Sequence, residues 1–182
     1  MSRAVCVFCG SRAGAPRDYR GLAADCGDRL VRAGWRIVYG GGDVGLMGAL
    51  ADAAIAAGGE VLGFMPERLL DREVGHRGIT DLAVTADMFE RKRLMIAGSD
   101  AFLALPGGLG TVDEILDVVT LRQLGYHDHP IVLVDDHAFW RPFAQLVEHV
   151  TAHGFADRSV LDLFTLAADL DAAVTALGPG AG

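Results

Sequence analysis

The stretch LPGGLGTVDE, residues 105–114, joins an apolar run to a helix-like segment through a turn rich in glycine. The apolar run begins at residue 101 and stops at Pro106. Glycine allows positive φ angles and lets the backbone come close to a ligand. The helix that follows would present free N–H groups and the positive end of its dipole, which suits a phosphate. These ten residues therefore predict a strand, a tight turn and a helix start that can bind an anion.

Strand-like and helix-like segments alternate in this way along the chain. The predicted strands are 4–9, 36–39, 61–65, 79–85, 101–105 and 131–134, and the predicted helices are 19–33, 46–57, 88–97, 111–124, 139–153 and 169–177. Such alternation is typical of an α/β fold in which helices cover both faces of a mostly parallel sheet. We predict one Rossmann-like domain over residues 1–178 with a short flexible tail at 179–182, and a polar loop at 71–78.

The composition is that of a globular protein with one core. The chain has 182 residues, of which 51% are hydrophobic, and this length suits a single domain. A net charge of −8 argues against nucleic acid as a partner, because general nucleic-acid binding needs a basic surface. The first apolar run is too short for a signal peptide or a membrane span. We therefore expect a cytoplasmic protein with no membrane partner.

Two groups of residues that could bind metal have simpler interpretations. Cys6 and Cys9 form a C-x-x-C pattern, but residues three apart in a strand point to opposite faces. We interpret them as small buried residues. His149 and His153 share a helix face, yet Val150 stands where a zinc-protease pattern requires glutamate. We expect no metal site.

Small residues follow the predicted strands at 9–11, 40–48 and 106–111. In a parallel sheet these turns share the carboxyl edge, where ligands of such folds bind. The pattern G-x-G-x-x-G at 40–45 matches a dinucleotide-binding turn, but the acidic residue that should end the next strand is missing, since Glu60 begins it. A Walker phosphate loop is excluded because the only lysine is Lys92. A ligand of nucleotide size is predicted, with neither motif complete.

A charged cluster begins the helix predicted at 88–97. Asp87 and Glu90 have the spacing of an N-cap and its partner. Arg91, Lys92 and the next arginine then occupy the first turns, where the helix dipole disfavours cations. A cluster that breaks a local rule needs a compensating interaction, and a bound anion is one. The alternative is that the charges are simply solvated.

Glu114 also has two interpretations. With Thr111 it forms the spacing of a capping box, so it could simply close the helix start. On a helical wheel, however, Glu114 falls between Val118 and Leu121, at the edge of the apolar stripe. A carboxylate in that position is shielded from water and can have a shifted pKa. We favour a functional carboxylate.

Together these residues resemble the LOG family, the cytokinin riboside 5′-monophosphate phosphoribohydrolases. The likeness extends from residue 5 through residue 125. An Arg-Lys pair at a helix start is matched by Arg91 and Lys92. The signature P-G-G-x-G-T-x-x-E is matched by Pro106, Gly107, Gly108, Gly110, Thr111 and Glu114. Members have often been labelled lysine decarboxylases, but a pyridoxal-phosphate enzyme needs a lysine for its Schiff base, and Lys92 stands between two arginines.

The resemblance implies hydrolysis of the N-glycosidic bond of an N6-substituted adenosine 5′-monophosphate, which releases the free base and ribose 5-phosphate without a cofactor. Glu114 would stabilise oxocarbenium-like charge and orient the attacking water, and Arg91 would act electrostatically with it. A homodimer is also implied. The expected substrate-binding residues are Gly10, Ser11, Gly42, Met88, Arg91, Lys92, Gly107, Gly108, Gly110, Thr111 and Thr120.

The chain departs from the family pattern at two positions. Phe89 stands where the family often has histidine, and Leu121 where it often has tryptophan. Both positions bear on the base pocket or on the dimer contact. Plain AMP is an alternative substrate. A carrier of a phosphorylated ligand, similar to molybdenum-cofactor carriers, or a nucleotide sensor is the alternative function, although neither needs a carboxylate beside the sugar.

Overall fold

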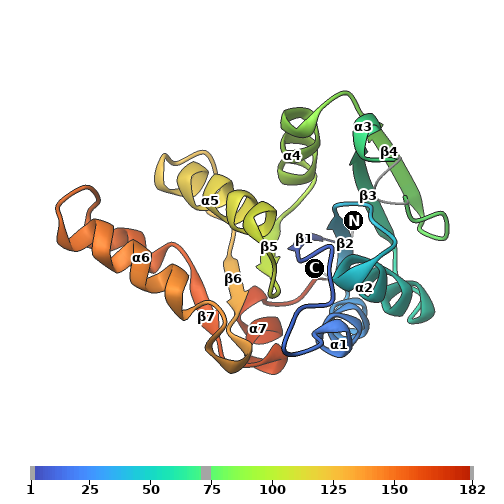
Figure 1. Cartoon of the computed structure of the whole chain (residues 1–182), viewed down its shortest axis with the longest axis horizontal. Helices are drawn as coiled ribbons and strands as arrows, with labels where there is room; N and C mark the ends of the chain where they lie inside the picture. The colour runs from blue at the N-terminus through green and yellow to red at the C-terminus, as the bar shows by residue number, and fades with distance from the viewer. Residues whose placement is uncertain (1–2, 71–74, 181–182) are drawn as a thin grey trace.

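The computed structural model describes residues 3–70 and 75–180. Its centre is a seven-stranded sheet in the order β4-β3-β2-β1-β5-β6-β7, and every pairing is parallel. The predicted α/β fold is therefore confirmed (Figure 1). The strands are β1 (Ala4–Phe8), β2 (Arg36–Tyr39), β3 (Val61–Pro66), β4 (Asp81–Thr85), β5 (Ala101–Ala104), β6 (Ile131–Val134) and β7 (Thr165–Ala167).

Helices cover both faces of this sheet. On one face α1, α2 and α7 pack against the strands, and on the other face α4, α5 and α6 do so (Figure 1). The far end of α6 extends away from the sheet together with η2. The helices are α1 (Arg20–Arg32), α2 (Gly45–Ala56), α3 (Glu67–Leu70), α4 (Met88–Ala97), α5 (Leu109–Gln123), α6 (Arg141–Ala152) and α7 (Leu170–Leu177), with 3₁₀ turns η1 (Asp136–Ala138) and η2 (Arg158–Asp162).

The alternation of side chains along β1 divides the core into two halves. Val5 and Val7 pack under α1 and α2, whereas Cys6 packs under α4 and α5. Cys9 belongs to the α1–α2 half, so the two cysteines of the C-x-x-C pattern do face opposite sides. Burial raises the pKa of both thiols well above its ordinary value. They are core residues, as the strand spacing predicts.

The chain reverses its direction of travel across the sheet at β1. From β1 it moves outward through β2 and β3 to β4, and then returns to β5 on the other side of β1. This position is a topological switch point, where the turns after neighbouring strands separate and leave a crevice. The turns after β1 and β5 are still joined there by a hydrogen bond of 3.2 Å from Gly10 N to the Pro106 carbonyl.

Several features differ from the sequence-based expectation or add to it. Helix α5 begins at Leu109 instead of residue 111, and β7 and α3 were not predicted because segments of three and four residues show no periodicity. Of the polar loop predicted at 71–78, residues 71–74 lie outside the described part. Within the expected tail, Gly180 accepts a hydrogen bond from Arg3 N and donates one to Ala33 O.

None of the helices in the described ranges combines the length and the apolar character that crossing a bilayer requires.

Candidate active site

A cavity of about 770 Å³ opens at the carboxyl edge of the sheet, at the switch point between β1 and β5. Its walls come from the turns after β1, β2 and β5 and from the starts of α2, α4 and α5. Of the residues predicted for the site, those that line the cavity are Gly10, Ser11, Met88, Arg91, Gly107, Gly108, Gly110, Thr111 and Glu114. Gly42, Lys92 and Thr120 do not line it.

Glycines allow the turns around the cavity to touch one another. Gly45 has a φ of +67°, and a Cβ there would overlap the carbonyl of Ser11. A Cβ on Gly107 would overlap the side chain of Thr111. Both positions therefore require glycine for close approach, and Gly45 also requires it for its left-handed conformation.

The start of α5 faces this cavity with unsatisfied N–H groups. Its N-cap is Gly108, which has no side chain, and no side-chain hydrogen bond caps the helix. The first N–H groups of a helix have no partner within the helix, so an anion can bind them. Thr111 lies inside the first turn and is not the N-cap. The capping-box interpretation of Glu114 is therefore wrong.

Arg91 is held rigidly although its side chain is long. The predicted N-cap is confirmed, because Asp87 Oδ1 accepts a hydrogen bond of 2.8 Å from Glu90 N and so fixes the start of α4. Arg91 is 7% exposed. Its Nε donates to the Phe64 carbonyl at 2.9 Å and its Nη2 to the Gly40 carbonyl at 3.2 Å. The cation is thus stabilised by backbone carbonyls of the protein, and the interpretation as a solvated charge is wrong for Arg91.

Glu114 is the partner of the remaining guanidinium nitrogen. Glu114 Oε1 lies 3.6 Å from Arg91 Nη1, and the Glu114 side chain is only 8% exposed. Burial raises the pKa of Glu114 to about 7, although Arg91 opposes this shift. Burial prevails because Arg91 is already shared between two carbonyls and approaches Glu114 at more than hydrogen-bond distance. A carboxyl group with such a pKa exchanges protons near neutral pH.

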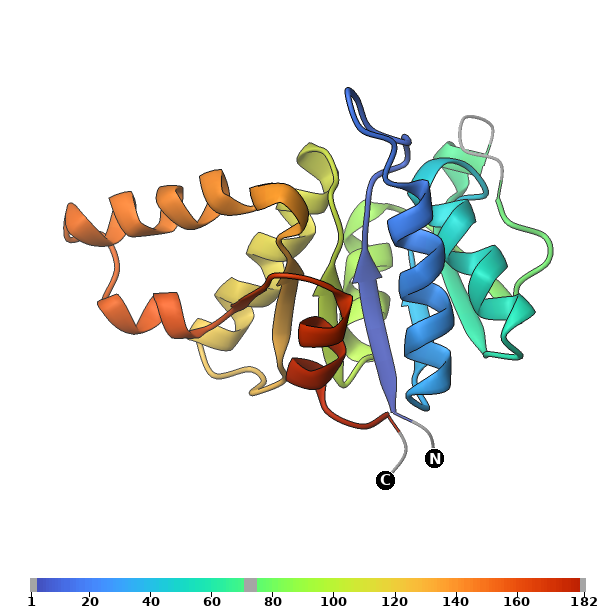
Figure 2. The same ribbon diagram turned by 90° about the horizontal axis from the view of Figure 1, so that it is seen from below.

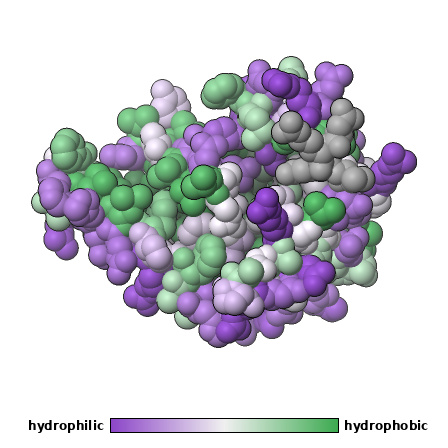
Figure 3. Space-filling model, in the orientation of Figure 1, coloured by the Kyte–Doolittle hydropathy of each residue, from purple (hydrophilic) through white to green (hydrophobic). Residues whose placement is uncertain are grey.

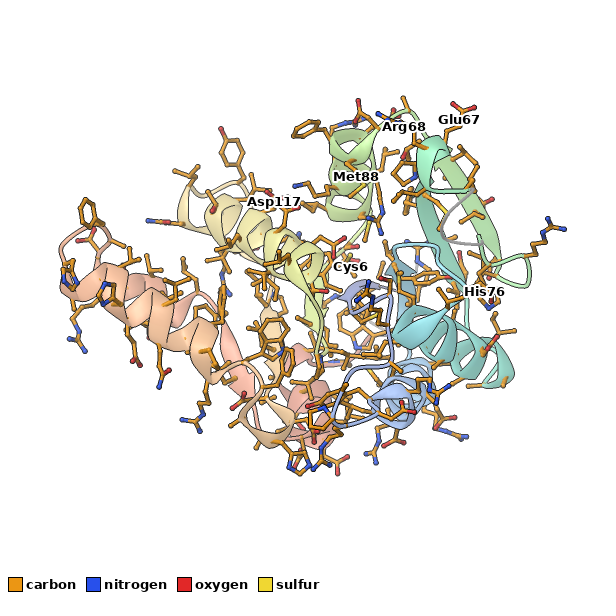
Figure 4. The ribbon with its side chains drawn as sticks, in the orientation of Figure 1. Cys6, Glu67, Arg68, His76, Met88 and Asp117 are labelled. Carbon is orange, nitrogen blue, oxygen red and sulfur yellow. The ribbon has the colours of Figure 1, made fainter. Side chains whose placement is uncertain are left out.

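Lys92 has a different position from the one predicted. Its Nζ lies 2.9 Å from Asp113 Oδ2 and 2.7 Å from Asp117 Oδ2, both on α5. Asp117 lies on α5 beside α4 (Figure 4), and Met88, the first residue of α4, lines the cavity. Lys92 therefore joins α4 to α5 outside the cavity, and this contact keeps Arg91 next to Glu114.

Two other predicted binding residues lie away from the cavity. The carbonyl of Gly42 accepts a hydrogen bond of 3.3 Å from the Tyr39 hydroxyl, and Gly42 pairs with Gly75 in an isolated bridge. It supports the turn after β2. Thr120 is exposed on α5. Glu60 forms an ion pair with Arg36 at the amino ends of β2 and β3. The acidic residue that a dinucleotide-binding motif needs at the carboxyl end of the strand is therefore still missing.

Sequence reasoning missed several residues of the cavity wall. Arg12 and Tyr19 lie in the segment after β1, directly beyond the small-residue turn that was recognised. That turn was the available signal. Phe139 and Leu69 line the cavity from short segments before α6 and in α3. Their positions depend on the path of the chain between elements, for which the sequence has no local pattern.

The fold and this site define an enzyme of the Rossmann-like α/β class with a buried Arg–Glu pair. Two solved structures share the fold. The molybdenum cofactor carrier protein of Chlamydomonas reinhardtii aligns with a TM-score of 0.73 at 20% identity, over 97% of this chain and 96% of that one. The molybdenum cofactor binding protein of Rippkaea orientalis aligns with a TM-score of 0.74 at 20% identity, over 96% and 94%.

The chain belongs to the LOG family of cytokinin riboside 5′-monophosphate phosphoribohydrolases. The protein of that name from Rhodococcoides fascians is 41% identical over 176 residues, which cover 96% of this chain and 89% of the relative. LOG3 of Arabidopsis thaliana, with the same description, is 38% identical over 91% of this chain and 77% of the relative. The matching family model, described as possible lysine decarboxylase, spans residues 47–177. The position of Lys92 does not suit that older description, since Schiff-base chemistry needs a free lysine at the cavity.

Gly40→Ala tests whether the placement of Arg91 matters. The added Cβ would overlap Arg91 Nη2, so the guanidinium has to move while the backbone conformation stays the same. We expect the variant to fold and kcat/KM of the family's hydrolytic reaction to fall by about 100-fold, because small misplacements of a catalytic group have costs of this order. Gly21→Ala adds the same methyl group on α1 with nothing within 4 Å and serves as the control. Equal activity of both variants would contradict this role of Arg91.

Glu114→Gln tests the raised pKa through stability. Between pH 4.5 and about 7 the folded state keeps a proton on Glu114 that the unfolded state has lost, so wild-type stability falls as the pH rises through this window. The shift from 4.5 to about 7 corresponds to about 3 kcal/mol. Gln does not ionise, so the free energy of unfolding of the variant relative to wild type should rise by up to that amount between pH 4.5 and pH 8. Glu148→Gln, at an exposed position of α6, is the control, and equal profiles for the two variants would refute a raised pKa of Glu114.

Proposed function

We propose that this chain hydrolyses the N-glycosidic bond of adenosine 5′-monophosphates that carry an N6 substituent. The oxygen of water bonds to C1′ of the ribose, the bond from C1′ to the base breaks, and the base leaves with a proton from that water. The products are the free base and ribose 5-phosphate. The observation that carries the proposal is the buried pair of Arg91 and Glu114 beside the uncapped start of α5.

The helix start of α5 would bind the 5′-phosphate. The backbone of Gly108 and Gly110 lines the cavity there, and Gly10 and Ser11 form the facing wall. Glu114 lies five residues beyond Leu109, which is about 7.5 Å along the helix axis. A nucleotide anchored by its phosphate at the helix start can therefore place its sugar next to Glu114.

The ionised form of Glu114 suits the reaction. A carboxylate beside the sugar stabilises the positive charge that develops on the ring as the base departs, and its second oxygen can orient the attacking water. With a pKa of about 7, a large fraction of Glu114 is ionised at neutral pH and above. Because the site is shielded from water, the interaction of this charge with the transition state is strong.

Arg91 would support this chemistry by charge and position. A guanidinium holds its proton too tightly to be a good proton donor, so it does not serve as the acid for the leaving base. It lowers the pKa of Glu114 from the value that burial alone would give, and it holds the carboxylate in position in the cavity. Its own hydrogen bonds to two carbonyls prevent it from following the ligand.

A carrier function is less well supported by the same geometry. A protein that only stores a phosphorylated ligand benefits from N–H groups and cations but not from a buried carboxylate in the same cavity. Such a carboxylate costs stability when it ionises and repels an anionic ligand. The molybdenum-cofactor proteins share the fold at 20% identity, which does not extend to the chemistry.

We also propose that two copies of the chain pair through α4, α5 and α6. Apolar side chains gather over α5 and α6 (Figure 3), and such a patch usually marks an interface. Thr120 lies on this face of α5, four residues from Leu116 and from Leu124, so it would meet the partner chain. Exposed apolar side chains on these three helices and at the end of α5 include Phe89 at 81%, Leu109 at 88%, Leu116 at 43%, Leu124 at 65% and Leu146 at 54%. The compartment we propose is the cytoplasm, because three free cysteines suit a reducing environment.

A product assay tests the hydrolase. Purified protein is incubated with AMP or N6-isopentenyl-AMP without added metal, and the free bases are separated by chromatography. We expect release of the base by wild type and a loss of about 10²- to 10³-fold in Glu114→Gln, the range for removing one group that stabilises the charge of the transition state. Glu148→Gln, which changes an exposed carboxylate on α6, should keep full activity. Intact nucleotide together with binding detected by calorimetry would favour a carrier or sensor.

Light scattering of a charged variant tests the dimer. Leu116→Glu places a charge in the middle of the apolar face of α5 and should shift the molar mass from dimer to monomer, because an unpaired charge buried in an interface is strongly unfavourable. Val44→Glu makes the same kind of change at a side chain that is 46% exposed at the start of α2, which covers the other face of the sheet. This control should remain a dimer. A monomeric wild type would contradict the proposed pairing.

A further inference from the structure

The cavity has few positive charges with which to bind an anionic ligand. Among the residues of ranges 3–70 and 75–180 that line it, the formal charges belong to Arg12, Arg91 and Glu114. The start of α5 adds about half a positive charge. A phosphate group bears up to two negative charges, and an ionised Glu114 opposes its approach. At least one cation that is free to contact the phosphate is therefore needed.

The two cations expected from the sequence to bind the anion are already occupied. The guanidinium of Arg91 donates to the carbonyls of Phe64 and Gly40 and faces Glu114 with its remaining nitrogen. The ammonium group of Lys92 lies between two aspartates and does not line the cavity. Neither can contact a phosphate at the start of α5 without giving up these interactions.

Arg12 is in the opposite situation. It lines the cavity, its side chain is exposed, and within the described ranges it forms no side-chain hydrogen bond or ion pair. Its backbone, in contrast, is closely confined. The preceding Gly10 is bonded to the Pro106 carbonyl, and a Cβ on Gly45 would come within 2.6 Å of Arg12 N. A fixed backbone with an unengaged guanidinium at the mouth of an anion site is suited to bind a ligand.

We propose that Arg12 binds the 5′-phosphate of the nucleotide from the side of the cavity opposite the start of α5. This inference rests on the proposed function, since it assigns the group that recognises the phosphate of that substrate. The guanidinium would donate two parallel hydrogen bonds to phosphate oxygens while the N–H groups at the start of α5 bind the remaining ones. Arg91 is then left to act on the sugar side with Glu114.

The same segment offers a matched control. Arg17 is exposed, lies between β1 and α1 like Arg12, and does not line the cavity. Removing either arginine lowers the net charge of the chain by the same amount. The pair of variants Arg12→Ala and Arg17→Ala therefore separates a direct contact with phosphate from a general attraction of anions.

The test combines binding and kinetics. Binding of ribose 5-phosphate is measured by calorimetry, which needs no turnover, and KM and kcat are measured for N6-isopentenyl-AMP. We expect Arg12→Ala to weaken the binding of ribose 5-phosphate and to raise KM, each by about 10- to 100-fold, the range for the loss of one charged hydrogen-bonding partner. The value of kcat at saturating substrate should change little. Arg12→Lys should restore part of the loss, and Arg17→Ala should match wild type. Competition by adenosine, which has no phosphate, should be the same in Arg12→Ala and wild type.

Three results would overturn the assignment. In the first, the affinity of Arg12→Ala for ribose 5-phosphate stays within about twofold of wild type. In the second, Arg12→Ala and Arg17→Ala lose the same affinity for ribose 5-phosphate. In the third, wild type does not bind ribose 5-phosphate at all. Failure of the hydrolase proposal looks different. Wild type would then release no base from N6-isopentenyl-AMP or from AMP, while its binding of ribose 5-phosphate would still depend on Arg12.

Discussion

The contact between the turns after β1 and β5 is the constraint on which the whole site depends. The hydrogen bond of 3.2 Å from Gly10 N to the Pro106 carbonyl closes the bottom of the crevice that the switch point would otherwise leave open. Gly45 brings the start of α2 against the same turn from the other side. At Gly45 a side chain does not fit, because its Cβ would overlap the Ser11 carbonyl oxygen, and at Gly10 a Cβ would lie only 3.3 Å from the Arg12 carbonyl oxygen. The glycines thus determine the shape of the cavity before any functional group is added.

The pair of Arg91 and Glu114 shows how burial and charge are balanced in this cavity. Desolvation alone would keep Glu114 protonated, and a fully free Arg91 would keep it ionised. The pKa of Glu114 lies between these limits, because Arg91 donates hydrogen bonds to two backbone carbonyls and is not fully available to the carboxylate. The turn after β2 and the strand β3 therefore influence the proton affinity of a carboxyl group on α5. Reactivity here depends on where backbone carbonyls point.

Local patterns predicted much of the fold and part of the site. The glycine turn after β5 and the helix positions of Arg91 and Glu114 follow from residue types and from the 3.6-residue period, which act over short distances. The surroundings of Lys92 were not predictable, because its aspartate partners are about 20 residues away and meet it only after α4 packs against α5. Strand β7 has three residues, too few for a period. Arg12 was missed because an exposed arginine in a turn has no periodic signal.

The beginning of the first strand and the end of the last helix lie at the same place, at the edge of the sheet opposite the cavity. The backbone of Arg3 is hydrogen-bonded to that of Gly180, and Figure 2 shows the beginning of β1 and the end of α7 together at the edge opposite the turn after β1. A short linker could therefore join these two residues, and the chain could be opened instead at an exposed loop, as in a circular permutation. The loop at the far end of α6, near Phe155, is suited to such an opening because its residues are exposed.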